Sequence, residues 1–150
     1  MASLRDSLKE LKNALKKTDR APDGEGASGR VFSVHTKHSA ETLESTRRLL
    51  DKDPNNKELL DWFAFMLYSN EQFAEAIDIY RRLIEQDSNS IEHLYYLACC
   101  LYRTARTEEA VLRWQEAIKL DPMDAYGQKA REKLDQVYER DYEAQRLSKD

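Results

Sequence analysis

Residues 59–88, LLDWFAFMLYSNEQFAEAIDIYRRLIEQDS, decide the fold because the chain repeats their pattern one step further along. Moving the sequence by 34 residues brings apolar residues onto apolar residues and small residues onto small ones. The matching pairs are Leu60 and Leu94, Phe63 and Leu97, Ala64 and Ala98, Ala76 and Ala110, Tyr80 and Trp114, and Asp87 and Asp121. Self-similarity at a fixed period indicates structural units stacked on one another.

Each unit has the pattern of two helices joined by a short polar turn. Near 57–69 the apolar positions 60, 63, 64 and 67 have the spacing of one helix face, and a second such pattern follows near 73–86. Pro54 and Pro122 each follow an aspartate and end a helix, because proline lacks an N–H and disfavours helix in the preceding residue. Asn55 or Asn56 can cap the next helix. The pattern therefore predicts helical hairpins.

The two repeats, LLDWFAFML…QFAEAIDIYRRLIEQDS and LYYLACCLY…RTEEAVLRWQEAIKLDP, resemble the tetratricopeptide repeat (TPR), a 34-residue helix-turn-helix. The departures from the family pattern are Glu71 and Ala105 for the turn glycine, Thr107 for an aromatic residue, Leu83 for a small residue and Ser88 for proline. The resemblance implies an all-α fold, an α-α superhelix of stacked helical hairpins. It also implies a protein-binding function without catalysis.

The repeat spacing divides the chain into residues 1–38 and a TPR-like domain over 39–150. Within the domain we expect a half repeat at 39–56, full repeats at 57–90 and 91–124, and a C-terminal capping helix at 125–147. The capping helix has one apolar stripe and an otherwise charged surface, which suits the end of a stack. Gly127 lies near the start of this helix, where a glycine costs little.

Residues 1–38 allow two interpretations. Residues 2–18 form an amphipathic pattern with Leu4, Leu8, Leu11 and Leu15 on a narrow stripe. This helix either docks as the partner missing from the half repeat or belongs to a flexible arm outside the stack. Residues 23–36 contain three of the four glycines and are a poor helix. The apolar segment VFSV at 31–34 can lie against a groove.

Composition narrows the class of protein. The 150 residues have a net charge of −4 with both signs interspersed and 35% charged residues, so no basic footprint for nucleic acid is present. No apolar run approaches the roughly 20 residues that cross a bilayer, and the N-terminus is not a secretory signal. We expect a protein of a reducing compartment, the cytoplasm, with at most an organelle surface reached through a partner.

Motifs for catalysis, metals or cofactors are missing, so we expect no enzyme and no cofactor. The pair Cys99-Cys100 lacks the spacing of a zinc site. On a helix one of these cysteines should face the core while its neighbour turns away by about 100°. His35 and His38 are expected in solvent, and His93 at a surface beside Glu92.

The TPR resemblance places an inner, concave wall at the fifth, ninth and twelfth positions of each first helix. The residues at these positions are Asp61, Phe65, Tyr68, Tyr95, Cys99, Tyr102, Lys129 and Lys133. Chaperone-binding members of the family use lysine and asparagine side chains at these positions to hold a C-terminal carboxylate. In this sequence only Lys129 and Lys133 match that set. Aromatic side chains with lysines at one end better suit an apolar or amphipathic segment that carries some acidity. The alternative is that the wall packs against the chain's own N-terminal arm.

A second resemblance covers about a third of the chain. The segments YYLACCLYR and DPMDAYGQKAREKLDQ are similar to the last repeat and closing helix of the mitochondrial fission adaptor. That family has a C-terminal membrane anchor, whereas this sequence ends in YEAQRLSKD. We expect an adaptor or scaffold that binds a peptide or amphipathic helix of a partner protein. One form of this hypothesis makes the chain a subunit of a larger assembly. The alternatives are an assembly chaperone or co-chaperone and a fission-adaptor-like protein at an organelle surface.

Overall fold

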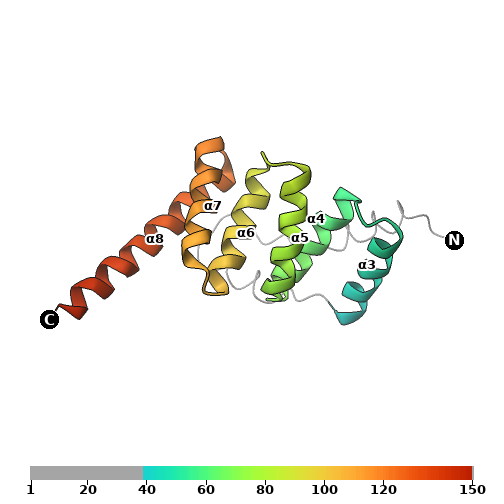
Figure 1. The fold of residues 1–150 in the computed structure, drawn as a ribbon, viewed down its shortest axis with the longest axis horizontal. Coiled ribbons are helices and arrows are strands. Elements are labelled where there is room, and N and C mark those ends of the chain that lie inside the picture. The colour runs from blue at the N-terminus through green and yellow to red at the C-terminus, as the bar shows by residue number, and fades with distance from the viewer. Residues whose placement is uncertain (1–38, 150) are drawn as a thin grey trace, which may run out of the picture. The chain divides into compact units, whose positions relative to one another are not determined.

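The computed structural model describes residues 39–149, and every regular element in this part of the chain is an α-helix (Figure 1). In chain order the helices are α3 (Ala40–Lys52), α4 (Lys57–Ser69), α5 (Phe73–Gln86), α6 (Ile91–Arg103), α7 (Thr107–Leu120) and α8 (Ala125–Ser148). The helix expected at 2–18, the arm, the segment 31–34, His35 and His38 lie outside the described residues. The division of the chain at residue 38 stays a prediction.

The described helices form two compact units, with the boundary inside α5 between Ile79 and Tyr80. In the first unit α3 packs against α4. The side chain of Asn56 accepts a hydrogen bond from the Leu59 N–H at 3.1 Å, so the predicted helix cap is present. The buried face of α4 is entirely apolar and consists of Leu59, Leu60, Phe63, Ala64, Met66 and Leu67.

In the second unit α6 packs against both α7 and α8, and α7 packs against α8. Tyr80 and Trp114, which the sequence places at equivalent positions, are both almost completely buried. Aromatic side chains of this size dominate the burial energy of a small core. The predicted fold class, all-α with TPR-like helical hairpins and a C-terminal capping helix, is confirmed.

Two expectations for α6 are wrong. Cys99 and Cys100 are both buried, and so is His93, whose ring lies 6.1 Å from the ring of Tyr80. The reason is that α6 lies between neighbours, with α7, α8 and Tyr80 all contacting it. A helix covered on several sides has buried residues around most of its circumference. The angle of about 100° between Cys99 and Cys100 therefore leaves both side chains buried, and the position of His93 beside Glu92 does not expose it.

The turns within the hairpins need the backbone conformation that glycine adopts most easily. Glu71 and Ala105 occupy the positions of the usual glycine, and both have positive φ angles of 61° and 64°. A side chain in this left-handed region costs roughly 1–2 kcal/mol. Glu71 and Ala105 in place of the usual glycine therefore lower the stability of the fold but leave the conformation of the turn unchanged.

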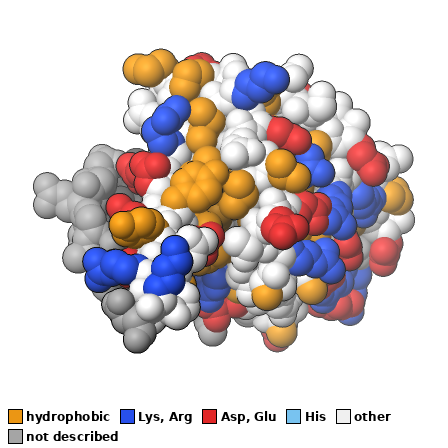
Figure 2. All heavy atoms as spheres, turned by 60° about the vertical axis from the view of Figure 1, so that its left-hand side comes forward, with side chains coloured by type: hydrophobic (Ala, Val, Ile, Leu, Met, Phe, Trp, Pro, Cys, Tyr) orange, Lys and Arg blue, Asp and Glu red, His pale blue; other side chains and the backbone are white. Residues whose placement is uncertain are grey.

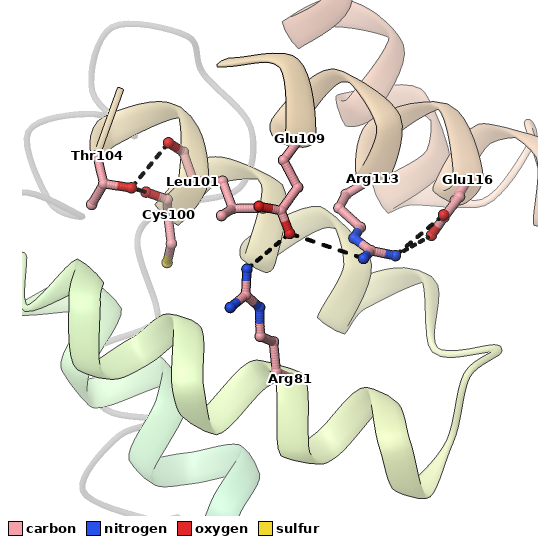
Figure 3. A network of polar contacts seen from close by, with 7 residues as sticks. All are labelled: Arg81, Cys100, Leu101, Thr104, Glu109, Arg113 and Glu116. Atoms are coloured by element: carbon pink, nitrogen blue, oxygen red, sulfur yellow. Dashed lines mark hydrogen bonds and ion pairs between the residues drawn. The ribbon is translucent and has the colours of Figure 1, made fainter. Parts of the chain in front are cut away.

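An ion pair recurs at the 34-residue period. Arg47 binds Glu75 at 2.6 Å in the first unit, and Arg81 binds Glu109 at 2.8 Å in the second. Figure 3 shows the second pair, with Glu109 also near Arg113. The next step of the series places Gln115 at the arginine position, and its amide donates to the Tyr138 hydroxyl at 3.3 Å instead. The series of ion pairs therefore ends where α8 covers α7.

Helix α8 has the two faces of a cap. Its buried stripe consists of Gly127, Ala130, Leu134 and Val137, and every described residue after Val137 is exposed. On α4 and α6, the buried residues Leu60, Phe63, Ala64 and Leu67 have the equivalents Leu94, Leu97, Ala98 and Leu101. On α8 the same positions carry Gln128, Arg131, Glu132 and Asp135, all exposed. The positions that pack between helices in the two repeats are therefore polar on α8, as expected of a capping helix.

Gly127 has a packing role that its position near a helix start did not reveal. It is buried, and a Cβ at this residue would press on the backbone carbonyl oxygen of Asp121 and lie 3.5 Å from the Pro122 Cα. The absence of a side chain lets the first turn of α8 approach the end of α7.

Candidate functional site

Five of the predicted groove residues lie on two helices of the second unit that pack directly against each other. Tyr95, Cys99 and Tyr102 belong to α6, while Lys129 and Lys133 belong to α8. We call the surface formed by these five residues, together with Tyr126 and Arg140, the α6–α8 face.

One end of the α6–α8 face is a cluster of aromatic rings. The Tyr126 ring lies 5.6 Å from the rings of both Tyr95 and Tyr96, which are themselves 5.2 Å apart. The ammonium group of Lys129 lies 5.0 Å from the centre of the Tyr126 ring, within the range of a cation–π contact. Aromatic contacts thus fix the first turns of α8 against α6 and hold a cation at their edge.

The other end is fixed by a single hydrogen bond between the helices. Arg140 donates from Nη1 to the hydroxyl oxygen of Tyr102 at 2.7 Å. The Tyr102 ring also lies 5.8 Å from the ring of the buried Trp114, so Tyr102 links Arg140 to the core. The guanidinium group therefore has a defined place although Arg140 itself is exposed.

Burial separates the face into a floor and a rim. Tyr95 and Cys99 are only 8% and 6% exposed, so they form the floor. Tyr102 and Lys133 are half-buried, and Lys129 is exposed, so they form the rim.

Cys100 follows the floor residue Cys99 on α6 but is not part of the face. Burial, and to a lesser degree the neighbouring Cys99, raises the pKa of the Cys100 thiol, so this thiol stays protonated and is a poor nucleophile.

The remaining three predicted residues belong to α4 in the first unit. Asp61, Phe65 and Tyr68 are all half-buried, and the Tyr68 ring meets the ring of Phe73 edge-on at 5.8 Å. These side chains occupy the same positions along α4 that Tyr95, Cys99 and Tyr102 occupy along α6. Their part in binding stays a prediction.

Neither Tyr126 nor Arg140 occupies one of the repeat positions that predicted the groove. Helical spacing could have indicated Arg140, because it follows Lys129 by eleven residues, about three turns, and so lies on the same side of α8. Tyr126 lies on the apolar stripe of the capping helix. Its contacts with Tyr95 and Tyr96 show that it also borders the predicted inner positions.

A separate set of apolar side chains in the second unit is exposed. Figure 2 shows hydrophobic side chains near the middle of the face that carries α7 and α8, with charged side chains around them. The large exposed hydrophobic residues are Leu112, Leu120, Met123, Tyr138, Tyr142 and Leu147. One of them, Tyr138 on α8, accepts a hydrogen bond from the Gln115 side chain on α7 at 3.3 Å.

Two kinds of site are missing from residues 39–149. No three histidine, cysteine, aspartate or glutamate side chains in this range come together as metal ligands. Within the same range none of the helices combines the length and apolar character that a membrane span requires.

Comparison with protein families assigns the repeats. The family model described as "Anaphase-promoting complex, cyclosome, subunit 3" (ANAPC3) matches residues 38–120. The chain belongs to this family. ANAPC3 proteins have TPR-like repeats, so the predicted TPR membership is confirmed, and repeats of this type are protein–protein interaction modules. No curated protein sequence matches the chain. The resemblance to the fission adaptor stays a prediction.

The ANAPC3 match covers α3 to α7 and ends at Leu120. Helix α8 lies beyond it, so Tyr126, Lys129, Lys133 and Arg140 are outside the part of the chain that the family model describes. The α6–α8 face therefore combines one helix from the matched repeats with one helix that follows them.

Proposed function

We propose that the chain is a non-enzymatic adaptor or scaffold that binds a segment of a partner polypeptide on the α6–α8 face. The observation that supports this most is the Arg140–Tyr102 hydrogen bond together with the Tyr126 cluster. These contacts hold the aromatic side chains and two of the cations, Lys129 and Arg140, in a fixed arrangement before any partner arrives. A preorganised surface loses less conformational entropy on binding than a flexible one.

Membership of the ANAPC3 family supports a place in a multi-subunit assembly, because the family is named for a subunit of a complex. We propose that the chain acts as such a subunit, or brings a partner to one, in the cytoplasm. Two free, buried cysteines suit a reducing compartment. In the first unit, Asp61, Phe65 and Tyr68 provide a further contact for the partner.

The test compares proteins recovered from a cell extract with wild type and with the variant Tyr102→Ala/Lys133→Ala. The matched control is Leu112→Ala/Lys119→Ala, which removes an exposed apolar residue and an exposed lysine from α7. Circular dichroism establishes that each variant is folded. We expect the α6–α8 variant to lose specific proteins that the control retains. Identical recovery by both variants and wild type would show that binding uses another surface.

A further inference from the structure

We infer that the α6–α8 face selects an acidic, extended segment, in which carboxylate side chains along the segment pair with Lys129, Lys133 and Arg140. This inference rests on the proposed function and adds the chemistry of the partner.

The three cations form one stripe along α8. At 100° per residue, Lys133 and Arg140 lie about 40° and 20° around the helix from Lys129. The stripe borders α6 at both ends, since Lys129 sits on the Tyr126 ring that contacts Tyr95, and Arg140 binds Tyr102. The stripe therefore runs beside the aromatic floor.

The stripe is also free of counter-charges among the described residues. None of Lys129, Lys133 and Arg140 forms an ion pair with another residue in 39–149. The acidic residues Glu132, Asp135 and Glu139 lie about 60–120° from Lys129 on the adjoining side of α8. Glu143, three residues after Arg140, lies about 40° from Lys129 and is the nearest acid on this helix. Only Glu92 approaches from α6, where its carboxylate accepts from the Tyr126 hydroxyl at 3.5 Å. A chain with net charge −4 thus presents three cations together on one face.

The distances between the three cations along α8 predict how far apart the acidic residues of the bound segment should be. A helix rises about 1.5 Å per residue, so Lys129 and Lys133 are about 6 Å apart along α8, and Lys133 and Arg140 about 10 Å. An extended chain advances about 3.3 Å per residue. Side chains alternate between the two faces of an extended chain, so acidic residues at the first, third and seventh positions lie on one face, about 6.6 and 13 Å apart, within reach of the long Lys and Arg side chains. The fifth position lies on the same face and can place an apolar side chain toward Tyr102.

The charges favour a partner protein over the chain's own N-terminal segment. Residues 1–38 contain eight Lys or Arg against five Asp or Glu, so their net charge has the same sign as the stripe. Like charges oppose association, whereas an acidic segment gains from each contact and associates faster. The cations also stand beside a row of aromatic rings, which an amphipathic acidic segment can cover.

The experiment measures fluorescence anisotropy of a labelled peptide with the full chain. The peptide is N-acetylated and C-amidated, and it carries Glu at its first, third and seventh positions, Leu or Phe at its fifth position and Ser elsewhere. The comparison peptides have Gln in place of Glu, the three Glu residues placed consecutively, or a free C-terminal carboxylate. A short single-stranded RNA serves as a non-protein polyanion. The protein variants are Lys129→Glu/Lys133→Glu and Arg140→Glu, with Lys119→Glu on α7 as the matched charge reversal.

We expect Lys129→Glu/Lys133→Glu to weaken binding of the acidic peptide by about tenfold or more and Lys119→Glu by less than about twofold. Raising the salt concentration should weaken wild-type binding, because exposed charges are screened. Equal binding of the Glu and Gln peptides, unaffected by the α8 variants, would overturn the acidic preference while leaving peptide binding on this face intact. An equal loss in Lys119→Glu, or tighter binding of the RNA, would also overturn it. A strict need for the free carboxylate would assign the cations to a chain terminus and refute side-chain recognition.

Discussion

The substitution Gly127→Ala tests how closely α8 approaches the end of α7. An added Cβ would press on the carbonyl oxygen of Asp121. That oxygen has little room to move, because it accepts from the Asp124 N–H at 3.3 Å, and the Asp121 N–H in turn binds the Ala117 carbonyl oxygen at 3.4 Å. The methyl group therefore forces either the turn or the first turn of α8 to shift.

Two effects of opposite sign decide the magnitude. Alanine has a higher helix propensity than glycine, which alone stabilises by about 1 kcal/mol. Insertion of a methyl group into a tightly packed site costs typically about 1–3 kcal/mol and more where backbone must move. Because the obstacle is a backbone carbonyl group, we expect a net destabilisation of about 1–2 kcal/mol. For a domain of this size the thermal midpoint should fall by roughly 4–10 °C.

Thermal and urea unfolding followed by circular dichroism measure this effect. The matched control is Asp135→Ala, an exposed position on the same helix, which should change the free energy of unfolding by no more than about 0.5 kcal/mol. An increase in stability for Gly127→Ala would refute the reasoning, because it would mean that helix propensity alone governs this position.

Three further predictions concern turns, ion pairs and the buried thiol. Ala105→Gly and Glu71→Gly should each stabilise by about 0.5–1 kcal/mol in urea unfolding, because both residues have positive φ; a loss of stability would contradict the strain. A double-mutant cycle of Arg81→Ala and Glu109→Ala should give a coupling below about 1 kcal/mol, since both side chains are partly exposed; a larger coupling would show that the pair is a main stabilising contact. The raised pKa of Cys100 means that the folded state holds the thiol proton more tightly than the unfolded state. Stability from this group is therefore constant below the ordinary thiol range, near pH 8.5, and falls as pH rises above it. Between pH 7 and 9.5 wild type should lose more stability than Cys100→Ala, and equal losses would contradict the shift.

Much of the fold could be predicted from periodicity because the repeat pattern is local. The apolar spacing at 57–69 and 73–86 agrees with α4 and α5, and Asn56 caps α4 as its position suggested. The burial of His93 and Cys99 could not be predicted in the same way. Burial of a side chain depends on how many neighbouring helices cover α6, which the pattern of one helix does not reveal.

The site was predictable in part for the same reason. Repeat positions led to Tyr95, Tyr102, Lys129 and Lys133, which the structure places on adjacent helices. The hydrogen bond from Arg140 to Tyr102 joins residues 38 apart and depends on the length and direction of α8. The close approach at Gly127 likewise arises from the turn between α7 and α8, which local helix rules do not describe.

Site-specific photocrosslinking tests the central claim most directly. A benzoylphenylalanine placed at the exposed Gln136, which lies between Lys133 and Arg140 on α8, is compared with one at Leu112 on the exposed surface of α7. After irradiation in cells that express the full chain, mass spectrometry of the adducts identifies the protein captured and the peptide joined to each probe. We predict adducts of one recurring partner segment from position 136 and not from position 112. Adducts from position 112 alone, or none that differ between the two positions, would contradict a binding role for this face.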